Sequence, residues 1–279
     1  MVKARSEAAE AARRPRILVT NDDGINAPGL RILERVARTL SSDVWVVAPE
    51  TNQSGASHSL TMHRPLRIRR VSRRRFAIDG TPTDCVLLAL QTVIKNGAVD
   101  LVLSGVNHGA NLGEDVTYSG TIAAAMEATL FNVPAIALSQ SCRNGHPVKW
   151  ATAEHHAPGI ISRLFIEEWQ KDLLINVNFP DLAAGSVKGM QVTTQGKRKL
   201  GDELLERIDP RGEPYVWIGG LRVEEGFQNG TDLQAVAEGY ISVTPIHMDM
   251  THRASFERLR RVLGQGEANQ AEAPSAGRR

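Results

Sequence analysis

The sequence predicts an α/β fold in which a mostly parallel, doubly wound β-sheet is covered by helices on both faces. Short apolar runs, the pattern of strands buried on both faces, alternate with segments whose apolar residues recur at helical spacing. After Pro180 this alternation stops, and shorter strand-like pieces follow that are separated by Gly, Pro and charged residues. We therefore expect a large core followed by a smaller C-terminal β-rich portion with a protruding hairpin or arm.

Apolar runs and helical periodicities place the individual elements of the core. Buried strands are expected at residues 16–20, 44–48, 100–103, 134–138 and 173–177. Helices are expected at residues 29–40, from Thr81 or Thr83 to Ile94, at about 119–131 and at 151–170. Residues 65–79 contain a stretch that alternates at period two and predicts an antiparallel insertion, whereas Gly and polar residues predict long loops at 50–59 and 104–118.

The same patterns divide the chain into four segments. Residues 1–15 are rich in Ala and Arg and are expected to form a flexible extension, and residues 16–185 form the expected core. Residues 186–263 form the β-rich portion with its arm, and residues 264–279 lack periodicity and are expected to be a disordered tail. The strand-like pieces of the β-rich portion lie at 188–195, 214–218 and 239–246.

The composition narrows the class of protein and its location. Lys and Arg number 33 against 31 Asp and Glu, so the formal net charge of +2 does not favour a nucleic-acid partner. No apolar run approaches the roughly 18 residues that a membrane span needs, and residues 1–15 lack the apolar core of a secretory signal. Cys85 and Cys142 are too few for a disulfide framework. We expect a cytoplasmic protein that binds neither nucleic acid nor a membrane.

Polar side chains follow several of the predicted strands, where parallel strands present their carboxyl ends at one edge of the sheet. Asn21, Asp22 and Asp23 come directly after the first strand. The later loops add further candidates: Ser54, His58, Ser104, Asn107 and Asn111. Carboxylate and neutral oxygen ligands suit Mg²⁺, Mn²⁺ or Ca²⁺. The sequence therefore predicts a site for a divalent cation at this edge.

Ser119, Gly120 and Thr121 stand at the start of a predicted helix, where unpaired N–H groups and the helix dipole favour an anion. A cation beside such a helix start is the arrangement that hydrolysis of a phosphate ester requires. Each feature alone also has a purely structural explanation, because Asp-Gly is a common turn and Ser and Thr are good N-caps. Their joint placement on one sheet edge favours a functional site.

Motifs of three other enzyme classes are missing from the sequence. No G-x-x-x-x-G-K-[ST] supports a P-loop NTPase, and no G-x-G-x-x-G follows the first strand as in dinucleotide-binding dehydrogenases. No G-x-S-x-G supports a serine hydrolase. The carboxylate pair therefore remains the main indication of chemistry.

A series of motifs stands in a fixed order along the chain: ILVTNDDG (17–24), VVAP (46–49), DGTPTDC (79–85), LSGVNHGANLG (103–113), YSGTIAAAME (118–127), NVNFP (176–180) and GYISVTPIHMDMT (239–251). In this combination and order they resemble the SurE (survival protein E) family of 5′/3′-nucleotidases. The resemblance covers about residues 16–251, and its N-terminal motifs are the more specific ones.

The resemblance implies a Rossmann-like core and a swapped C-terminal arm that builds homodimers, often homotetramers. It implies that one divalent cation per subunit, Mg²⁺ or Mn²⁺, is held by four ligands: Asp22, Asp23, Ser54 and Asn107. It also implies a phosphate pocket made by four residues: Asn21, Ser119, Gly120 and Thr121.

Residues and resemblance together lead to the hypothesis of a metal-dependent phosphomonoesterase that converts nucleoside 5′- and 3′-monophosphates to nucleoside and phosphate. Asp22 and Asp23 are the expected catalytic residues, and either His58 or bulk water protonates the leaving alkoxide. Short polyphosphate is a further substrate implied by the resemblance. Two alternatives from other classes stay open, a non-catalytic nucleotide-binding module and a nucleotide-sugar transferase.

Overall fold

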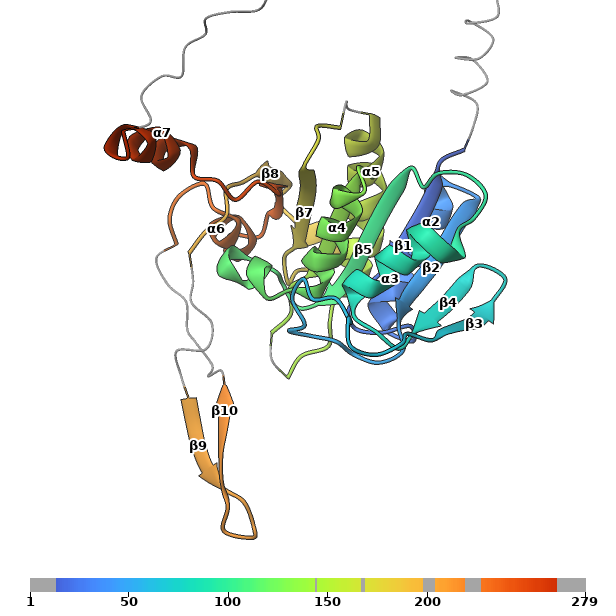
Figure 1. Ribbon diagram of the computed structural model, residues 1–279, viewed down its shortest axis with the longest axis horizontal. Helices are drawn as coiled ribbons and strands as arrows, with labels where there is room; N and C mark the ends of the chain where they lie inside the picture. The colour runs from blue at the N-terminus through green and yellow to red at the C-terminus, as the bar shows by residue number, and fades with distance from the viewer. Residues whose placement is uncertain (1–13, 144, 167–168, 198–203, 219–226, 265–279) are drawn as a thin grey trace, which may run out of the picture. The chain divides into compact units, whose positions relative to one another are not determined.

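The computed structural model describes residues 14–143, 145–166, 169–197, 204–218 and 227–264 of the 279-residue chain. The expected extension and tail fall almost entirely on residues 1–13 and 265–279, which lie outside the described residues. The described part has the expected fold class, a mostly parallel sheet flanked by helices, with a small antiparallel sheet (Figure 1).

Nine of the described strands form one sheet in the order β3-β4-β2-β1-β5-β6-β7-β11-β8 (Figure 1). Their bounds are β1 Arg16–Thr20, β2 Asp43–Pro49, β3 Ile68–Ser72, β4 Arg75–Ile78, β5 Leu101–His108, β6 Ala135–Gln140, β7 Leu173–Phe179, β8 Met190–Val192 and β11 Ile241–His247. The six strands β4, β2, β1, β5, β6 and β7 run parallel to one another. Strand β3 runs antiparallel to β4, and β11 runs antiparallel to β7. The parallel strands therefore follow the doubly wound order, which reverses between β1 and β5.

Two layers of helices cover the sheet. Helices α2 (Pro28–Leu40) and α5 (Trp150–Ile166) pack on one face, and α3 (Pro82–Leu88) and α4 (Gly120–Leu130) pack on the other. Alternate residues of β1 serve the two layers, because Ile17 and Val19 join the first cluster and Leu18 joins the second. This burial on both faces is the reason why the strands appear as continuous apolar runs in the sequence.

Capping residues fix where the helices on the second face begin. Thr81, one of the two expected caps, accepts a hydrogen bond from the backbone N–H of Asp84, whose side chain accepts one from the N–H of Thr81 in return. Beyond α3 the chain widens into one π-helical turn, η1 (Ala89–Val93). Ser119 caps α4 by accepting a hydrogen bond from the N–H of Ile122.

The loop expected at residues 104–118 is wrong in its first part, because β5 continues to His108. The pairing of β5 with β6 is irregular between Ser104 and Asn107. A Cβ atom at Gly105 would lie 2.2 Å from the carbonyl oxygen of Leu138, and its φ is +130°. The glycine and polar residues that predicted a loop here form an irregular strand end instead. Such irregularities often orient side chains toward functional sites. Part of the remaining stretch is a short 3₁₀-helix, η2 (Gly113–Thr117).

The C-terminal part contributes both strands and helices. Its strands β8 and β11 extend the main sheet, whereas β9 (Leu204–Ile208) and β10 (Pro214–Ile218) form a separate antiparallel hairpin. A short 3₁₀-helix, η3 (Ala184–Ser186), and two helices, α6 (Asp232–Ala237) and α7 (Arg253–Val262), go beyond the sequence-based prediction. Helix α7 belongs to a second compact unit that begins at Asp249. No helix in the described part of the chain has the length and apolarity to cross a membrane.

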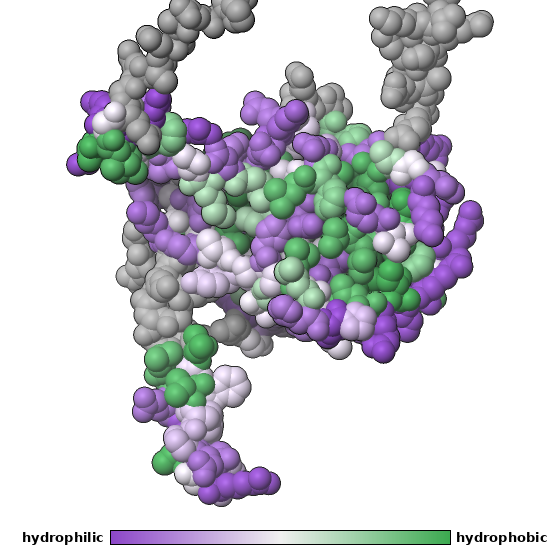
Figure 2. Space-filling view, in the orientation of Figure 1, coloured by the Kyte–Doolittle hydropathy of each residue, from purple (hydrophilic) through white to green (hydrophobic). Residues whose placement is uncertain are grey.

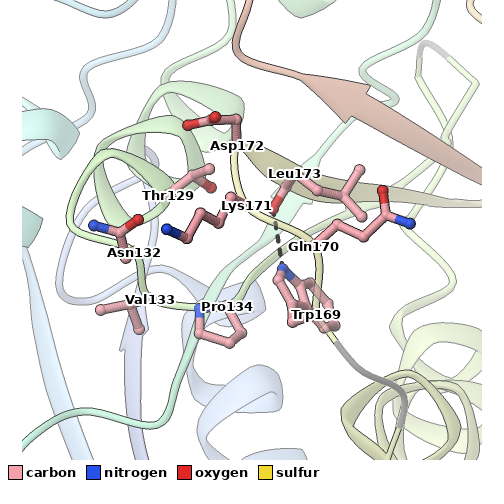
Figure 3. A pocket seen from close by; sticks show the side chains of 9 residues that line it. All are labelled: Thr129, Asn132, Val133, Pro134, Trp169, Gln170, Lys171, Asp172 and Leu173. Atoms are coloured by element: carbon pink, nitrogen blue, oxygen red, sulfur yellow. Dashed lines mark hydrogen bonds between the residues drawn. The ribbon is translucent and has the colours of Figure 1, made fainter. Parts of the chain in front are cut away.

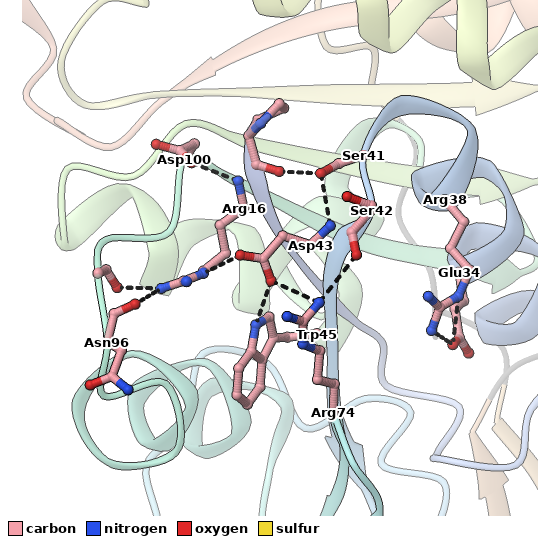
Figure 4. A network of polar contacts seen from close by, with 12 residues as sticks. Arg16, Glu34, Arg38, Ser41, Ser42, Asp43, Trp45, Arg74, Asn96 and Asp100 are labelled. Atoms are coloured by element: carbon pink, nitrogen blue, oxygen red, sulfur yellow. Dashed lines mark hydrogen bonds and ion pairs between the residues drawn. The ribbon is translucent and has the colours of Figure 1, made fainter. Parts of the chain in front are cut away.

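A polar network joins the amino ends of the central strands (Figure 4). The carboxylate of Asp43 accepts hydrogen bonds from Arg16 Nε (2.9 Å) and Trp45 Nε1 (3.0 Å), and Arg74 Nη1 lies at 3.1 Å. Partial burial favours the neutral acid, but the hydrogen bonds and charges of these neighbours outweigh it and lower the pKa of Asp43. Since this edge lies opposite the carboxyl ends of the strands, its ion pairs stabilise the fold away from the predicted site.

Replacement of Asp43 by alanine is expected to lower the free energy of unfolding by about 2 kcal/mol at neutral pH, because Arg16 and Trp45 lose their charged acceptor. A lowered pKa in the folded state means that this stabilisation is present above the unfolded value of about 3.9 and disappears as the pH falls through the folded value. Urea unfolding at neutral and acidic pH measures both effects. As a control, Glu154→Ala removes an ion pair with Arg35 whose side chains are 42% and 56% exposed, and about 0.5 kcal/mol or less is expected. Equal losses in the two variants would contradict this account.

Candidate metal and phosphate site

The predicted site residues gather where the strand order reverses. Thr20 at the end of β1 pairs with Ser104 of β5, so residues 21–23 leave β1 beside the last residues of β5. In doubly wound sheets this reversal opens a crevice outside the carboxyl ends of the strands, which is where ligands bind. The expectation that β1 and β5 bring their polar residues to one sheet edge is therefore confirmed.

Asp22 faces the start of α4. Its side chain is 3% exposed, and the hydroxyl of Thr121 donates a hydrogen bond of 2.5 Å to its Oδ1 atom. A Cβ atom at Gly120 would lie 2.7 Å from the Cβ of Asp22 and 3.0 Å from Pro82 Cγ. Only glycine therefore fits at this position, and the first turn of α4 lies directly against the carboxyl group. The structure thus brings together Asp22, Gly120 and Thr121, as the sequence predicts.

Asp23 faces the end of β5 instead. Its Oδ2 atom accepts a hydrogen bond of 3.1 Å from the backbone N–H of His108, and its side chain is half-buried. Beside it, the amide nitrogen of Asn107 donates to the carbonyl oxygen of Gly109 at 3.0 Å. This bond fixes the orientation of the Asn107 amide and leaves its oxygen as the atom available to a cation.

The loop that carries Ser54 is hydrogen-bonded to the turn formed by residues 21–24. The N–H of Gln53 donates to the carbonyl oxygen of Asp22 at 2.8 Å, and the N–H of Ser54 donates to Asn52 Oδ1 at 2.7 Å. The approach is close, because a Cβ atom at Gly24, where φ is +101°, would lie 3.1 Å from the carbonyl carbon of Thr51. Ser54 itself is exposed and belongs to the segment that covers the turn.

Burial makes the carboxyl pair unfavourable in its ionised form. Desolvation raises the pKa of Asp22 to about 6 despite the hydrogen bond from Thr121, and the charge of Asp23 raises it further. Burial also raises the pKa of Asp23, against the effects of the His108 N–H and ring. The effects that lower these pKa values come from Thr121 and His108 and do not offset the burial. A divalent cation would offset the two neighbouring negative charges.

The donor set fits a hard divalent cation. Asp22, Asp23, Ser54 and Asn107 would supply carboxylate, hydroxyl and amide oxygens, the ligands that suit Mg²⁺ and Mn²⁺. The part of the chain that the structure describes contains no group of three or more His, Cys, Asp or Glu side chains suited to a metal. Mixed oxygen donors are therefore the basis of the candidate site.

Asn21 and Asn111 have structural partners in this region. Asn21 closes the turn by donating from Nδ2 to the carbonyl oxygen of Gly24 at 3.1 Å, whereas its buried Oδ1 has no hydrogen-bond partner among the described residues. Asn111 instead joins a buried amide cluster, in which it binds Asn178 and Ser139. The hydrogen bond to Gly24 holds Asn21 in the turn, which leaves its Oδ1 as a free acceptor in the described part of the chain, and Asn111 anchors the loop after β5.

His58 has a partner that sequence reasoning missed. Its Nε2 atom lies 2.9 Å from Oε2 of Glu127, a residue of α4 that is 7% exposed. The loop before it is also tied down, since Ser57 bonds to the carbonyl oxygens of Thr117 and Tyr118. A carboxyl group within the Ala-rich sequence of α4 was the available signal for such a contact.

A cavity of about 330 Å³ lies at the other edge of the sheet, by the amino ends of β6 and β7 (Figure 3). Trp169 closes one side and donates from Nε1 to the carbonyl oxygen of Leu173 at 3.0 Å. Lys171 and Asp172 supply its charged side chains. None of the predicted site residues lines this cavity, so the sequence-based hypothesis concerns the carboxyl edge alone.

The doubly wound sheet with two carboxyl groups and a helix start at its reversal point places the chain among α/β proteins that bind ligands at the carboxyl edge of the sheet. Comparisons with known proteins define the family within this class. The model of the family described as Survival protein SurE matches residues 17–202. The chain belongs to the SurE family.

Individual relatives agree over most of the chain. The 5′-nucleotidase SurE of Paramagnetospirillum magneticum is 64% identical over 244 residues, which are 88% of this chain and 94% of the relative. The 5′-nucleotidase SurE of Parvibaculum lavamentivorans is 53% identical over 255 residues, or 89% and 91% of the two chains. The crystal structure of the SurE protein from Aquifex aeolicus superposes with a TM-score of 0.77 at 38% identity and covers 89% of this chain and 100% of that one.

In buffer containing EDTA, Asp22→Asn is expected to raise the free energy of unfolding by about 2–3 kcal/mol at pH 8, because a buried charge is removed. The pKa of Asp22 is raised to about 6 in the folded state. Its neutral form therefore stabilises the fold below the unfolded pKa, and this stability is lost as the pH rises through about 6. Urea unfolding between pH 5 and pH 8 should show this loss of stability with rising pH in the wild type and not in the variant.

Addition of Mn²⁺ to the same samples provides the complementary measurement. If the predicted site is correct, Mn²⁺ raises the unfolding midpoint of the wild type and has little effect on Asp22→Asn, because the cation would bind the folded state through this carboxylate. Glu154→Gln serves as a control for the loss of a carboxylate elsewhere. Equal stabilities of wild type and Asp22→Asn at pH 8 in EDTA would show that the burial of Asp22 carries no such cost.

Proposed function

We propose that this protein is a metal-dependent phosphomonoesterase that hydrolyses nucleoside 5′- and 3′-monophosphates, with short polyphosphate as a further substrate. Relatives that are 53–64% identical bear the name 5′-nucleotidase SurE, which supports nucleotidase activity. The observation that carries the proposal is the carboxyl pair, since Asp22 is buried against the start of α4 at the reversal point of the sheet. A site for anions alone gains nothing from two adjacent negative charges.

In this proposal one Mg²⁺ or Mn²⁺ per subunit is held by the four oxygen ligands named above. When bound, the cation supplies positive charge that stabilises the phosphoryl oxygens and makes a water molecule more acidic. Thr121 keeps Asp22 in place through its hydroxyl group, and the His108 N–H does the same for Asp23. The protein therefore holds both carboxyl groups in fixed orientations before substrate binds.

The start of α4 binds the phosphate. The N–H groups of the first turn, Gly120 and Thr121, have no carbonyl partner within the helix, and glycine at position 120 lets this turn lie directly beside Asp22. One of the two Asp carboxylates accepts the proton of the attacking water, since burial raises the pKa of both groups. His58 or bulk water returns a proton to the leaving alkoxide, and Glu127 holds the His58 ring through Nε2.

We also propose the cytoplasm as the location of the protein. Cys85 and Cys142 are both free thiols, as expected in a reducing compartment.

Activity is tested by phosphate release from 5′- and 3′-nucleoside monophosphates and tripolyphosphate, with Mg²⁺, Mn²⁺ or EDTA. Asp22→Asn is expected to lower kcat more than about 100-fold, the upper range for groups that merely support a metal ligand, because one ligand is lost. Glu154→Gln, which changes an exposed carboxylate on α5, should keep wild-type kcat. Near-normal turnover by Asp22→Asn would remove the carboxylate pair from the mechanism.

Binding of nucleotide without any phosphate release would favour a binding module, and release that needs an acceptor sugar would favour a transferase.

The hairpin β9–β10 supports a proposed assembly. Its strands pair only with each other in the described part of the chain, and all their residues are exposed. Seven of them are large and apolar, and Figure 2 shows such residues gathered on the hairpin: Leu204, Leu205, Ile208, Tyr215, Val216, Trp217 and Ile218. An isolated two-stranded hairpin is marginally stable in water. We propose that a second copy of the chain covers it, in a homodimer or homotetramer with exchanged arms.

The double variant Trp217→Asp and Ile218→Asp is expected to dissociate this assembly, because it places charge on both faces of the hairpin. Sedimentation velocity at micromolar concentration should show a dimer or tetramer for the wild type and a monomer for the variant. Arg207→Asp and Glu206→Lys serve as controls, because they reverse charges in the same hairpin and leave its apolar residues in place. A monomeric wild type would contradict the proposed assembly.

A further inference from the structure

A cavity of about 330 Å³ opens beside the carboxyl pair and is not used by the proposed chemistry. Asp23 lines it on one side. The other walls come from four segments: the start of α2, the loop after β2, the end of β5 and the residues around the start of α5. Its volume lies at the lower end of the range for small-molecule sites, which is about 300–1,000 Å³. The cavity is therefore large enough to receive part of a substrate.

The two carboxyl groups face opposite ways with respect to this cavity. Asp22 contacts Thr121 and Gly120 at the start of α4, whereas Asp23 bonds to the N–H of His108 and lines the cavity. A phosphate bound at the exposed edge of the carboxyl pair, next to the start of α4, would thus have the cavity on the side of Asp23. In a phosphomonoester, the group on that side is the organic part of the substrate.

An indole ring forms one wall of the cavity. Trp150, the first residue of α5, is half-buried and packs against the core, and its centroid lies 6.3 Å from that of the His108 ring. The ring is seated on α2, because a Cβ atom at Gly29 would lie 3.1 Å from its Cζ3 atom. Gly29 in turn lies so close to β5 that such an atom would overlap the carbonyl oxygen of Val106. The position of the Trp150 ring is therefore set by a backbone contact that admits only glycine.

The remaining walls combine apolar and polar groups. Ala27, Pro28 and Val148 supply apolar surface. Asn52 lines the cavity as well, and its Oδ1 accepts the N–H of Ser54, so its amide nitrogen is the end left to donate. A flat aromatic wall with apolar neighbours and a few polar groups is the chemistry that receives a heteroaromatic ring.

We propose that this cavity is the subsite for the base of the nucleotide, and that Trp150 determines specificity by stacking on it. The inference rests on the proposed nucleotidase function and adds to it the residue that recognises the organic part of the substrate. Purines, which cover more of an indole ring than pyrimidines, are the preferred bases.

The test compares a purine nucleoside 5′-monophosphate with ribose 5-phosphate, which has the same ester but no base. In Trp150→Ala the ratio of kcat/KM for the two substrates should fall roughly 5- to 100-fold through a higher KM for the nucleotide, as expected for the loss of one base–aromatic stack. Trp150→Phe should restore most of the ratio. Trp169→Ala, which removes an indole from the cavity at the opposite edge, should leave the ratio unchanged.

A second variant covers the case in which Trp150→Ala does not fold. Val148→Trp fills the cavity instead of emptying it and should lower the same ratio. An unchanged ratio in both variants, or equal losses for both substrates, would overturn the proposal.

Calorimetry separates this proposal from the proposed function. A purine nucleoside without phosphate is titrated into wild type, Trp150→Phe and Trp150→Ala. If the wild type releases no phosphate from any substrate, the nucleotidase function fails, but nucleoside binding that is lost only in Trp150→Ala still supports the subsite. Failure of the wild type to bind the nucleoside, or equal binding by Trp150→Ala, would overturn it.

Discussion

The site depends on the burial of two adjacent carboxyl groups at the point where the strand order of the sheet reverses. Ionised carboxylates are costly in such a place, and the pKa of Asp22 rises to about 6 because of it. Backbone contacts hold Asp22 in this place. The start of α4 lies against its side chain, and the N–H of Gln53 donates a hydrogen bond to its carbonyl oxygen. A side chain at Gly120 would separate the helix from the carboxyl group and remove this support.

Stability and chemistry are placed at opposite edges of the same sheet. At the amino edge, the carboxylate of Asp43 contacts Arg16, Trp45 and Arg74, and these contacts lower its pKa below the usual value. At the carboxyl edge, burial raises the pKa values of Asp22 and Asp23, and this effect outweighs the hydrogen bond from Thr121 and the opposing effect of His108. The same residue type therefore stabilises the fold at one edge and destabilises it at the other. Such an uncompensated pair is the pattern expected where a ligand supplies the missing charge.

The sequence predicted those parts that follow from local periodicity and from strand direction. Strands β1 and β6, helices α2 and α4, and the meeting of Asp22 with Thr121 follow from apolar spacing, capping and the rule for parallel strand ends. The end of β5 was missed because its irregular pairing requires glycine and polar residues that resemble a loop. Helix α6, with 6 residues, is too short to show a period. Glu127 stands out in the Ala-rich sequence of α4, but its partner His58 lies 69 residues away, and Trp150 faces His108 from a different element. Local patterns do not predict which residue becomes the partner.

The opposite orientations of the carboxyl pair give the site a direction. Asp22 is fixed toward a helix start that favours an anion, and Asp23 is fixed toward a cavity with an aromatic wall. Two neighbouring residues in a turn point to different sides, so under the proposed function a single strand end divides the crevice into a phosphate side and an organic side. The contacts of each side also differ in kind: backbone N–H groups bind any phosphate alike, whereas an indole ring distinguishes one leaving group from another. In the proposed function, a substrate that spans both sides presents its ester bond at the carboxyl pair, and selectivity among such substrates is decided on the side of Asp23.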